Sequence, residues 1–253
     1  MNQEKEQELL CKRLAELSNN AYYRGFCTYS DFLNLDEQNL FFNNFKEIVQ
    51  SKYLLWGGYE DAERRVICFY EDDSSTNMFP LVCLKILPIN HKFSDKLSHR
   101  DYLGAILNLG IERCKIGDIL VMENKGYVFC RQEISDYIVD NLTRIKHTSI
   151  TVTLVENEEI SDFKPQLEEI HGTVSSIRID SILSVAFHTS RSSLTGLIAG
   201  GKVYVNSRLI ESNSYNLKEG DVVSVRGMGK FIFQEAGDQT RKNRYKVTLL
   251  KYI

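Results

Sequence analysis

The sequence predicts an α+β protein with three consecutive regions: an N-terminal helical and hairpin region, a βαββαβ middle domain and a small α+β domain at the C-terminus. Three observations lead to this prediction. Apolar residues recur with helical spacing in the first 50 residues, strand-like and helix-like runs then alternate up to residue 155, and the charge changes sign near residue 172. We expect the regions to span residues 1–77, 78–157 and 172–253.

The N-terminal region is expected to begin with two amphipathic helices, over residues 5–24 and 36–50. Two strand-like runs follow, from Lys52 to Trp56 and from Arg65 to Tyr70. The polar, acidic stretch from Glu71 to Asn77 then predicts a domain boundary.

The middle domain shows the element order of a split βαβ, or ferredoxin-like, arrangement, which RRM-like domains share. Its expected strands lack the paired basic and aromatic residues with which an RNA recognition motif stacks bases. We therefore expect this domain to be a docking scaffold before it is an RNA reader. The expected elements are strand 80–87, helix 98–109, strand 118–122, strand 126–130, helix 131–142 and strand 148–155.

The C-terminal region follows an acidic connection, residues 156–171, whose last part alternates enough to continue as an edge strand to Ser175. Helical periodicity from Ser181 to Ala199 is broken near residues 188–190, which predicts two short helices. Lys202 to Val205 then alternates like a strand. Asn206 and Ser207 form the expected turn, and residues 217–225 supply the partner strand.

The charge of the C-terminal region is opposite to that of the remainder. Residues 172–253 contain 12 Lys and Arg against 6 Asp and Glu, whereas the whole chain has a net charge of −3. The first 171 residues therefore carry −9, and an overall pI near 6.0 conceals a basic C-terminal domain. Such a domain favours a phosphate-rich partner and salt-dependent binding.

Four short segments of this domain, taken together, resemble the RNA-binding domain named after small-subunit ribosomal protein four, here called the S-four type. They span residues 178–183, 190–191, 201–206 and 220–226. Ser190 is placed as the N-cap of the second helix, where free N–H groups favour a phosphate, and Arg191 lies in its first turn.

We expect nine residues of this domain to contact RNA and five to be structural. The expected RNA contacts are Arg178, Ser190, Arg191, Ser192, Lys202, Asn206, Arg208, Arg226 and Lys230. The expected structural residues are Asp180, Leu183, Gly201, Gly220 and Asp221. Two alternatives stay open: Arg178 and Asp180 could form a structural ion pair, and the basic excess could serve solubility. Residues 241–246 could be a backbone-tracking edge or the turn of a last hairpin.

Three upstream motifs extend the resemblance to essentially the whole chain. They lie at residues 57–64, 99–107 and 117–121, and with an S-four-type domain behind them they resemble the YlmH-type proteins of Gram-positive bacteria. That resemblance implies a ribosome-associated, rRNA-binding protein that docks on the large subunit beside a peptidyl-tRNA. Ribosome quality control of stalled translation is the implied role, and the family's gene neighbourhood also suggests cell division.

Within the resemblance, Arg178 and Arg191 match the two arginines that carry RNA binding in the rescue-factor type of S-four domain. Ser207 is a departure, because many S-four domains have glycine after the asparagine of this turn. Serine makes the turn less permissive without removing a contact group.

The sequence also excludes several sites. His99-Arg100-Asp101 is not a kinase catalytic loop, because Ile106 stands where a metal-binding asparagine is needed. Gly200-Gly201-Lys202 is not a phosphate loop and Gly227-Met228-Gly229 is not a dinucleotide site. The six scattered cysteines and the five histidines show no metal-ligand spacing. We expect no catalytic residues, no metal and no cofactor.

No run approaches the roughly 18 apolar residues of a membrane span. We therefore expect no membrane insertion, and the scattered cysteines predict reduced thiols in the cytoplasm. We expect a monomer with rRNA as its partner, and peptidyl-tRNA and cell-division proteins are further candidate partners. Two other functions stay open: an RNA-modifying enzyme of the pseudouridine synthase or methyltransferase class, and a cell-division scaffold with incidental RNA binding.

Overall fold

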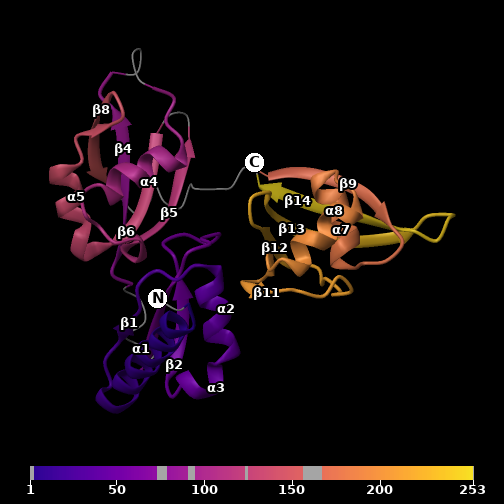
Figure 1. The fold of residues 1–253 in the computed structure, drawn as a ribbon, viewed down its shortest axis with the longest axis horizontal. Coiled ribbons are helices and arrows are strands. Elements are labelled where there is room, and N and C mark those ends of the chain that lie inside the picture. Colours follow the sequence, from indigo (N-terminus) through magenta and orange to yellow (C-terminus); the bar gives the residue numbers. More distant parts are fainter. Residues whose placement is uncertain (1–2, 73–78, 91–94, 123–124, 156–166, 253) are drawn as a thin grey trace. The chain divides into compact units, whose positions relative to one another are not determined.

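The computed structural model describes residues 3–72, 79–90, 95–122, 125–155 and 167–252, and it places them in two compact units (Figure 1). Unit 1 is Met1–Phe163 and unit 2 is Lys164–Ile253. The expected boundary near residue 77 and most of the acidic connection lie outside the described residues. The division at residues 77 and 157 therefore stays a prediction, whereas the α+β architecture is confirmed.

Unit 1 begins with three helices and a small antiparallel sheet of order β1-β3-β2. The core between them contains Leu14 of α1, Phe41 of α2 and Phe69 of β3, all at most 1% exposed. The elements are α1 (Gln3–Arg24), β1 (Thr28–Tyr29), α2 (Leu35–Asn43), α3 (Phe45–Ile48), β2 (Lys52–Trp56) and β3 (Val66–Tyr70).

The helix expected over residues 36–50 is two helices, because the chain leaves the helical path at Asn44. The side-chain amide of Asn44 donates to the carbonyl of Leu40, which also accepts the backbone N–H of Asn44. Such local bonds compete with the continuation of a helix. The start of α2 is fixed by a capping box between Asn34 and Glu37.

The second part of unit 1 is a five-stranded sheet of order β5-β6-β4-β8-β7, in which the paired strands are antiparallel. This order is compatible with the expected split βαβ arrangement, although the ferredoxin-like name stays a prediction. The elements are β4 (Leu81–Pro88), α4 (His99–Leu107), η3 (Arg113–Lys115), β5 (Ile116–Met122), β6 (Lys125–Arg131), η4 (Gln132–Ile134), α5 (Ser135–Asn141), β7 (Arg144–Ile145) and β8 (Thr148–Leu154).

The two faces of this sheet pack against different parts of the unit. Tyr102 and Ile106 of α4 and Ile138 of α5 form one core with the strands. On the opposite face, Phe129 and Tyr127 of β6 cluster with Phe32 and Val66 of the N-terminal part. Residues of both parts therefore share one core, with Phe129 at its centre and 1% exposed.

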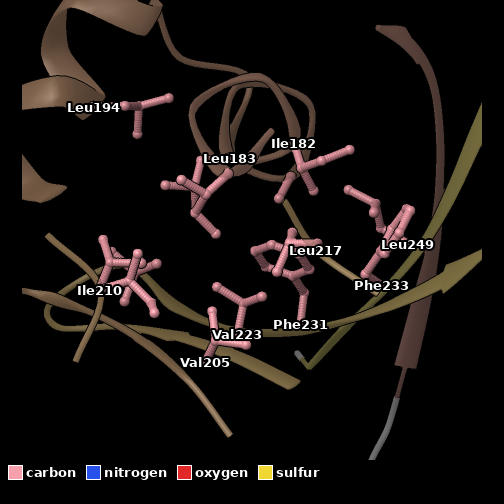
Figure 2. Packing of buried hydrophobic residues seen from close by; sticks show 14 of the residues in the cluster. Ile182, Leu183, Leu194, Val205, Ile210, Leu217, Val223, Phe231, Phe233 and Leu249 are labelled. Carbon is pink, nitrogen blue, oxygen red and sulfur yellow. The ribbon is translucent and has the colours of Figure 1, made fainter. Parts of the chain in front are cut away.

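Unit 2 is a six-stranded antiparallel sheet of order β11-β10-β12-β13-β14-β9, covered by two helices. Figure 2 shows Ile182 and Leu183 of α7 pointing onto Val223, Phe231 and Phe233 of the sheet. The elements are β9 (Leu167–Val174), α7 (Ile179–Phe187), α8 (Arg191–Ala199), β10 (Val203–Val205), β11 (Arg208–Leu209), β12 (Val222–Val225), β13 (Gly229–Gln239) and β14 (Tyr245–Tyr252).

The basic stretch of residues 241–246 lies in the expected last hairpin. It covers most of the turn between β13 and β14 and the first residues of β14. The turn is closed by two hydrogen bonds, from Thr240 N to Arg244 O at 2.7 Å and from Asn243 N to Thr240 O at 2.9 Å. No helix in the described part of the chain is long and apolar enough to cross a membrane.

Candidate RNA-binding surface

Arg178 begins helix α7 and is tied to Asp180. It occupies the N-cap position, and its Nη2 atom donates to Asp180 Oδ2 at 3.1 Å. The side chain of Asp180 is 8% exposed, whereas that of Arg178 is 42% exposed. The structural ion pair is therefore present, and it still leaves much of the Arg178 side chain accessible. Its Nε atom is buried and finds no hydrogen-bond partner among the described residues.

The second helix begins as expected from the sequence. His188 ends α7 in the left-handed conformation, at φ 50°, and Ser190 is the N-cap of α8. The Ser190 hydroxyl pairs with that of Ser193 at 3.0 Å and makes no side-chain bond to the backbone of the first turn. The side chains of Arg191 and Ser192 lie outside what the structure describes, but their backbone forms the first turn of α8.

Three of the expected cations come together around the β12–β13 hairpin. Arg226 donates its backbone N–H to Lys202 O at 2.9 Å, so the two residues are neighbours at the ends of β12 and β10. Lys230 lies one residue beyond the closing pair of the same hairpin, opposite Ser224. Lys202 and Arg226 are exposed. We call Lys202, Arg226 and Lys230 the hairpin cluster.

Aromatic rings support two cations of the hairpin cluster. The Arg226 guanidinium lies 5.4 Å from the ring centre of Tyr204, and the Lys230 ammonium lies 4.4 Å from that of Tyr252. Contacts of this kind restrict a long side chain. The hairpin cluster therefore holds at least two positioned cations.

Arg208 is not part of this cluster. It pairs with Val205 in β11, at the end of β10 remote from Lys202, and it is exposed. Its expected contact with RNA therefore concerns a separate edge of the sheet.

Asn206 is used by the fold itself. Its side-chain nitrogen donates to Asp221 Oδ1 at 2.8 Å, and its side-chain oxygen accepts from Val222 N at 3.0 Å. Asp221 Oδ2 also accepts from Lys218 N at 2.7 Å. Both polar atoms of the Asn206 side chain are thus hydrogen-bonded within unit 2. A contact between Asn206 and RNA stays a prediction, and it would compete with these bonds.

The five residues expected to be structural are either buried or at positive φ. Leu183 is fully buried in the core of unit 2. Gly201 and Gly220 have φ values of +66° and +84°, in the left-handed region that favours glycine. Asp180 and Asp221 are both buried carboxylates, at 6% and 8% exposure.

Two of the three upstream motifs, residues 57–64 and 117–121, meet at one place in unit 1, which sequence reasoning did not find. The Asp118 carboxylate accepts from Tyr59 Oη at 2.9 Å, from Glu63 N at 2.6 Å and from Arg64 N at 3.0 Å. Burial and the nearby Asp118 carboxylate raise the pKa of Tyr59. Arg64 in turn donates to the carbonyls of Ile116 and Phe32. These motifs form a joint between the N-terminal part and the sheet of β4–β8.

The remaining upstream motif, at residues 99–107, caps a helix. Asp101 Oδ2 accepts from Ser98 N and from Ser98 Oγ at the start of α4, and Lys146 binds Asp101 Oδ1 at 2.7 Å. The buried face of α4 includes Tyr102 and Ile106, while Leu107 is 36% exposed. Among the residues that the structure describes, no three His, Cys, Asp or Glu side chains gather as metal ligands.

Comparisons with known proteins agree with the resemblance drawn from the motifs. Residues 76–159 match the family described as "Putative RNA-binding domain in YlmH", and residues 177–223 match the S4 domain. The ribosome-associated protein quality control protein P2 of Bacillus subtilis is 29% identical over 196 residues, which are 76% of this chain and 75% of that protein. The S-four type expected from the sequence is the S4 domain, and that identification is confirmed. The match over residues 76–159 agrees with the YlmH-type resemblance.

A solved structure, the cell division protein ylmH from Streptococcus pneumoniae, is also similar. It aligns with a TM-score of 0.49 at 20% identity, covering 61% of this chain and 93% of that one.

Proposed function

We propose that this chain, which pairs the YlmH RNA-binding domain with an S4 domain, binds ribosomal RNA and acts without catalysis in the quality control of stalled translation. Its target is the large ribosomal subunit beside a peptidyl-tRNA, in the cytoplasm. The similarity to a Bacillus subtilis protein named for ribosome-associated quality control supports the ribosomal part of the proposal. The two RNA-binding domain families support the RNA part.

The observation that carries the proposal is the hairpin cluster. Lys202, Arg226 and Lys230 surround one hairpin of a domain with a net charge of +6, in a chain whose remainder is acidic. Contacts to phosphates supply much of the affinity of RNA-binding proteins and fix their orientation. Arg178 and Arg191 are proposed as further contacts, at the starts of the two helices.

Sedimentation with large ribosomal subunits through a sucrose gradient tests the proposal. The wild-type chain is expected to co-sediment at low salt and to dissociate as salt rises. The variant Lys202→Gln/Arg226→Gln should lose most of this binding, because it removes two phosphate contacts. Each lost contact should also lower the slope of log affinity against log salt by roughly 0.7–0.9.

The matched control is Arg24→Gln/Lys46→Gln, which removes the same charge from exposed positions on unit 1. It should co-sediment like the wild type. The proposal is wrong if the wild-type chain stays at the top of the gradient at low salt, or if the hairpin variant co-sediments as well as the control.

A further inference from the structure

RNA binding by the middle domain cannot use the sheet face on which an RNA recognition motif stacks bases. The aromatic residues of the central strand β6 that would serve there are Tyr127 and Phe129, and they are only 6% and 1% exposed. Tyr59 stacks on Phe129, with ring centres 4.9 Å apart and planes 23° apart. Tyr59, from the N-terminal part of unit 1, thus stacks where an RNA recognition motif would stack an RNA base.

The opposite side of the same sheet carries an open groove of about 480 Å³ along helix α4. That volume falls within the usual range of ligand sites. One wall is a stripe of α4 and its C-terminal extension, whose ends at Arg100 and Asn108 are about 12 Å apart along the axis. The other wall is the segment from Asn141 to Lys146. The lining residues are Arg100, Asp101, Gly104, Ala105, Asn108, Leu109, Asn141, Leu142, Thr143, Arg144 and Lys146.

The charges in this groove favour an anion. The lining contains three cations, Arg100, Arg144 and Lys146, and one carboxylate, that of Asp101. Asp101 is already bound by Lys146 and by Ser98, which lower its pKa to about 2. In the part of the chain that the structure describes, no ion pair involves Arg100 or Arg144, and both are exposed. The groove is therefore a local basic site on an acidic unit.

Gly104 points to a close approach of a ligand in the middle of the groove. It lies inside the nine-residue helix α4, where glycine is less stable than alanine. A Cβ atom at this position would meet nothing within 4 Å, so the packing of unit 1 does not demand glycine. The lack of a side chain at Gly104 does, however, keep the floor of the groove open between Arg100 and Asn108.

We propose that the α4 groove binds the phosphate backbone of single-stranded RNA, with Arg100 and Arg144 contacting phosphates and Gly104 allowing the strand to lie against the helix. This rests on the proposed RNA-binding function and adds a second RNA contact, on unit 1, to that of the S4 domain. The description of the matching family gives RNA binding to the domain and to no surface of it.

The test is the binding of a short fluorescent single-stranded RNA to the full chain carrying Lys202→Gln/Arg226→Gln, which suppresses the hairpin cluster. In this background, Arg100→Gln/Arg144→Gln should weaken binding by about tenfold or more at low salt. It should also lower the slope of log affinity against log salt by about 1.4, the contribution of two phosphate contacts to a single strand.

A filling variant separates the groove from general charge effects. Gly104→Phe adds no charge and should also weaken binding, whereas Gly104→Ala adds a single methyl group to the floor of the groove and should weaken binding less. Arg24→Gln/Lys46→Gln serves as the charge-matched control and should leave binding unchanged. Thermal unfolding of every variant shows whether it is folded.

The inference is overturned if the two groove variants bind the RNA as their parent does, or if the charge control weakens binding as much as Arg100→Gln/Arg144→Gln. Its failure is distinguishable from that of the proposed function, because sedimentation with large subunits depends on the hairpin cluster. If RNA binding depends on the groove but the chain does not sediment with large subunits, the groove proposal stands and the ribosomal target is wrong.

Discussion

Arg178 has two roles that a single substitution would mix. It is a candidate phosphate contact with an accessible side chain, and it is also the partner of the nearly buried carboxylate of Asp180. Loss of RNA binding after Arg178→Ala would therefore not by itself identify a contact, because the start of α7 would change as well.

A double-mutant cycle separates these roles. Arg178→Ala should lower the free energy of unfolding by about 1–3 kcal/mol, because it leaves a buried carboxylate without its partner. The double variant Arg178→Ala/Asp180→Ala should be less destabilised than the two single variants added together. Urea denaturation of the four proteins measures the coupling. Strict additivity would show that the ion pair has no structural role.

At the scale of elements, the β10–β11 hairpin departs from the usual chemistry of its turn. Val205 pairs with Arg208, so the loop consists of Asn206 and Ser207 alone, with φ values of 49° and 65°. Two-residue loops with both central residues at positive φ favour Asn-Gly, because glycine adopts this conformation without a Cβ clash. Here Asn206 meets the requirement and Ser207 does so at a cost.

Ser207→Gly is expected to raise the free energy of unfolding by about 0.5–1 kcal/mol, since relief of left-handed strain outweighs the greater backbone entropy of glycine. Thermal or urea unfolding measures the change. Ser207→Ala is the control and should give no gain, because alanine keeps the Cβ. A destabilised Ser207→Gly protein would contradict this account of the turn.

The elements that sequence patterns identified are those with enough residues to show a period. The strand expected from Lys52 to Trp56 has those bounds in the structure, and both helices of unit 2 were expected within one or two residues of theirs at most ends. Three strands that were missed, β1, β7 and β11, have two residues each, whereas β13, with 11 residues, was foreseen only as part of a possible last hairpin. Pairing with a neighbouring strand defines the three short strands, and two residues carry no periodicity.

The site was predictable to a similar extent. Residue type and order identify the cations of the S4 domain, and the structure adds which of them are neighbours. Patterns along the chain could not show that Asn206 is engaged by Asp221, 15 positions away, or that Asp118 binds a motif more than 50 positions earlier. Such contacts depend on the tertiary fold. The same holds for the covered aromatic face of β6.

At the scale of the whole molecule, unit 1 should behave as one folding unit although its sequence suggests two regions. A fragment of residues 79–155 would lose Phe32, Val66 and Tyr59, and it would expose Tyr127 and Phe129. Newly exposed apolar patches of this kind promote aggregation.

We therefore expect the fragment 79–155 to be poorly soluble or markedly less stable than residues 1–155, as circular dichroism and size-exclusion chromatography can show. The fragment 167–253 contains its own core of buried residues and should fold alone with a single unfolding transition. A stable, monomeric 79–155 fragment would favour the division at residue 77 that the sequence suggested.

The order of strands in unit 2 has a consequence for how that unit assembles. Strand β9 is the first strand of the unit in the chain, yet its partner is β14, the last, with Leu167 opposite Tyr252. The hairpin of β13 and β14 closes locally, whereas β9 must wait for a partner made some 70 residues later. Contacts of such high contact order form slowly. During synthesis β9 is thus made before its partner strand β14 exists. The sheet of unit 2 can therefore be completed only after the end of the chain has been synthesised.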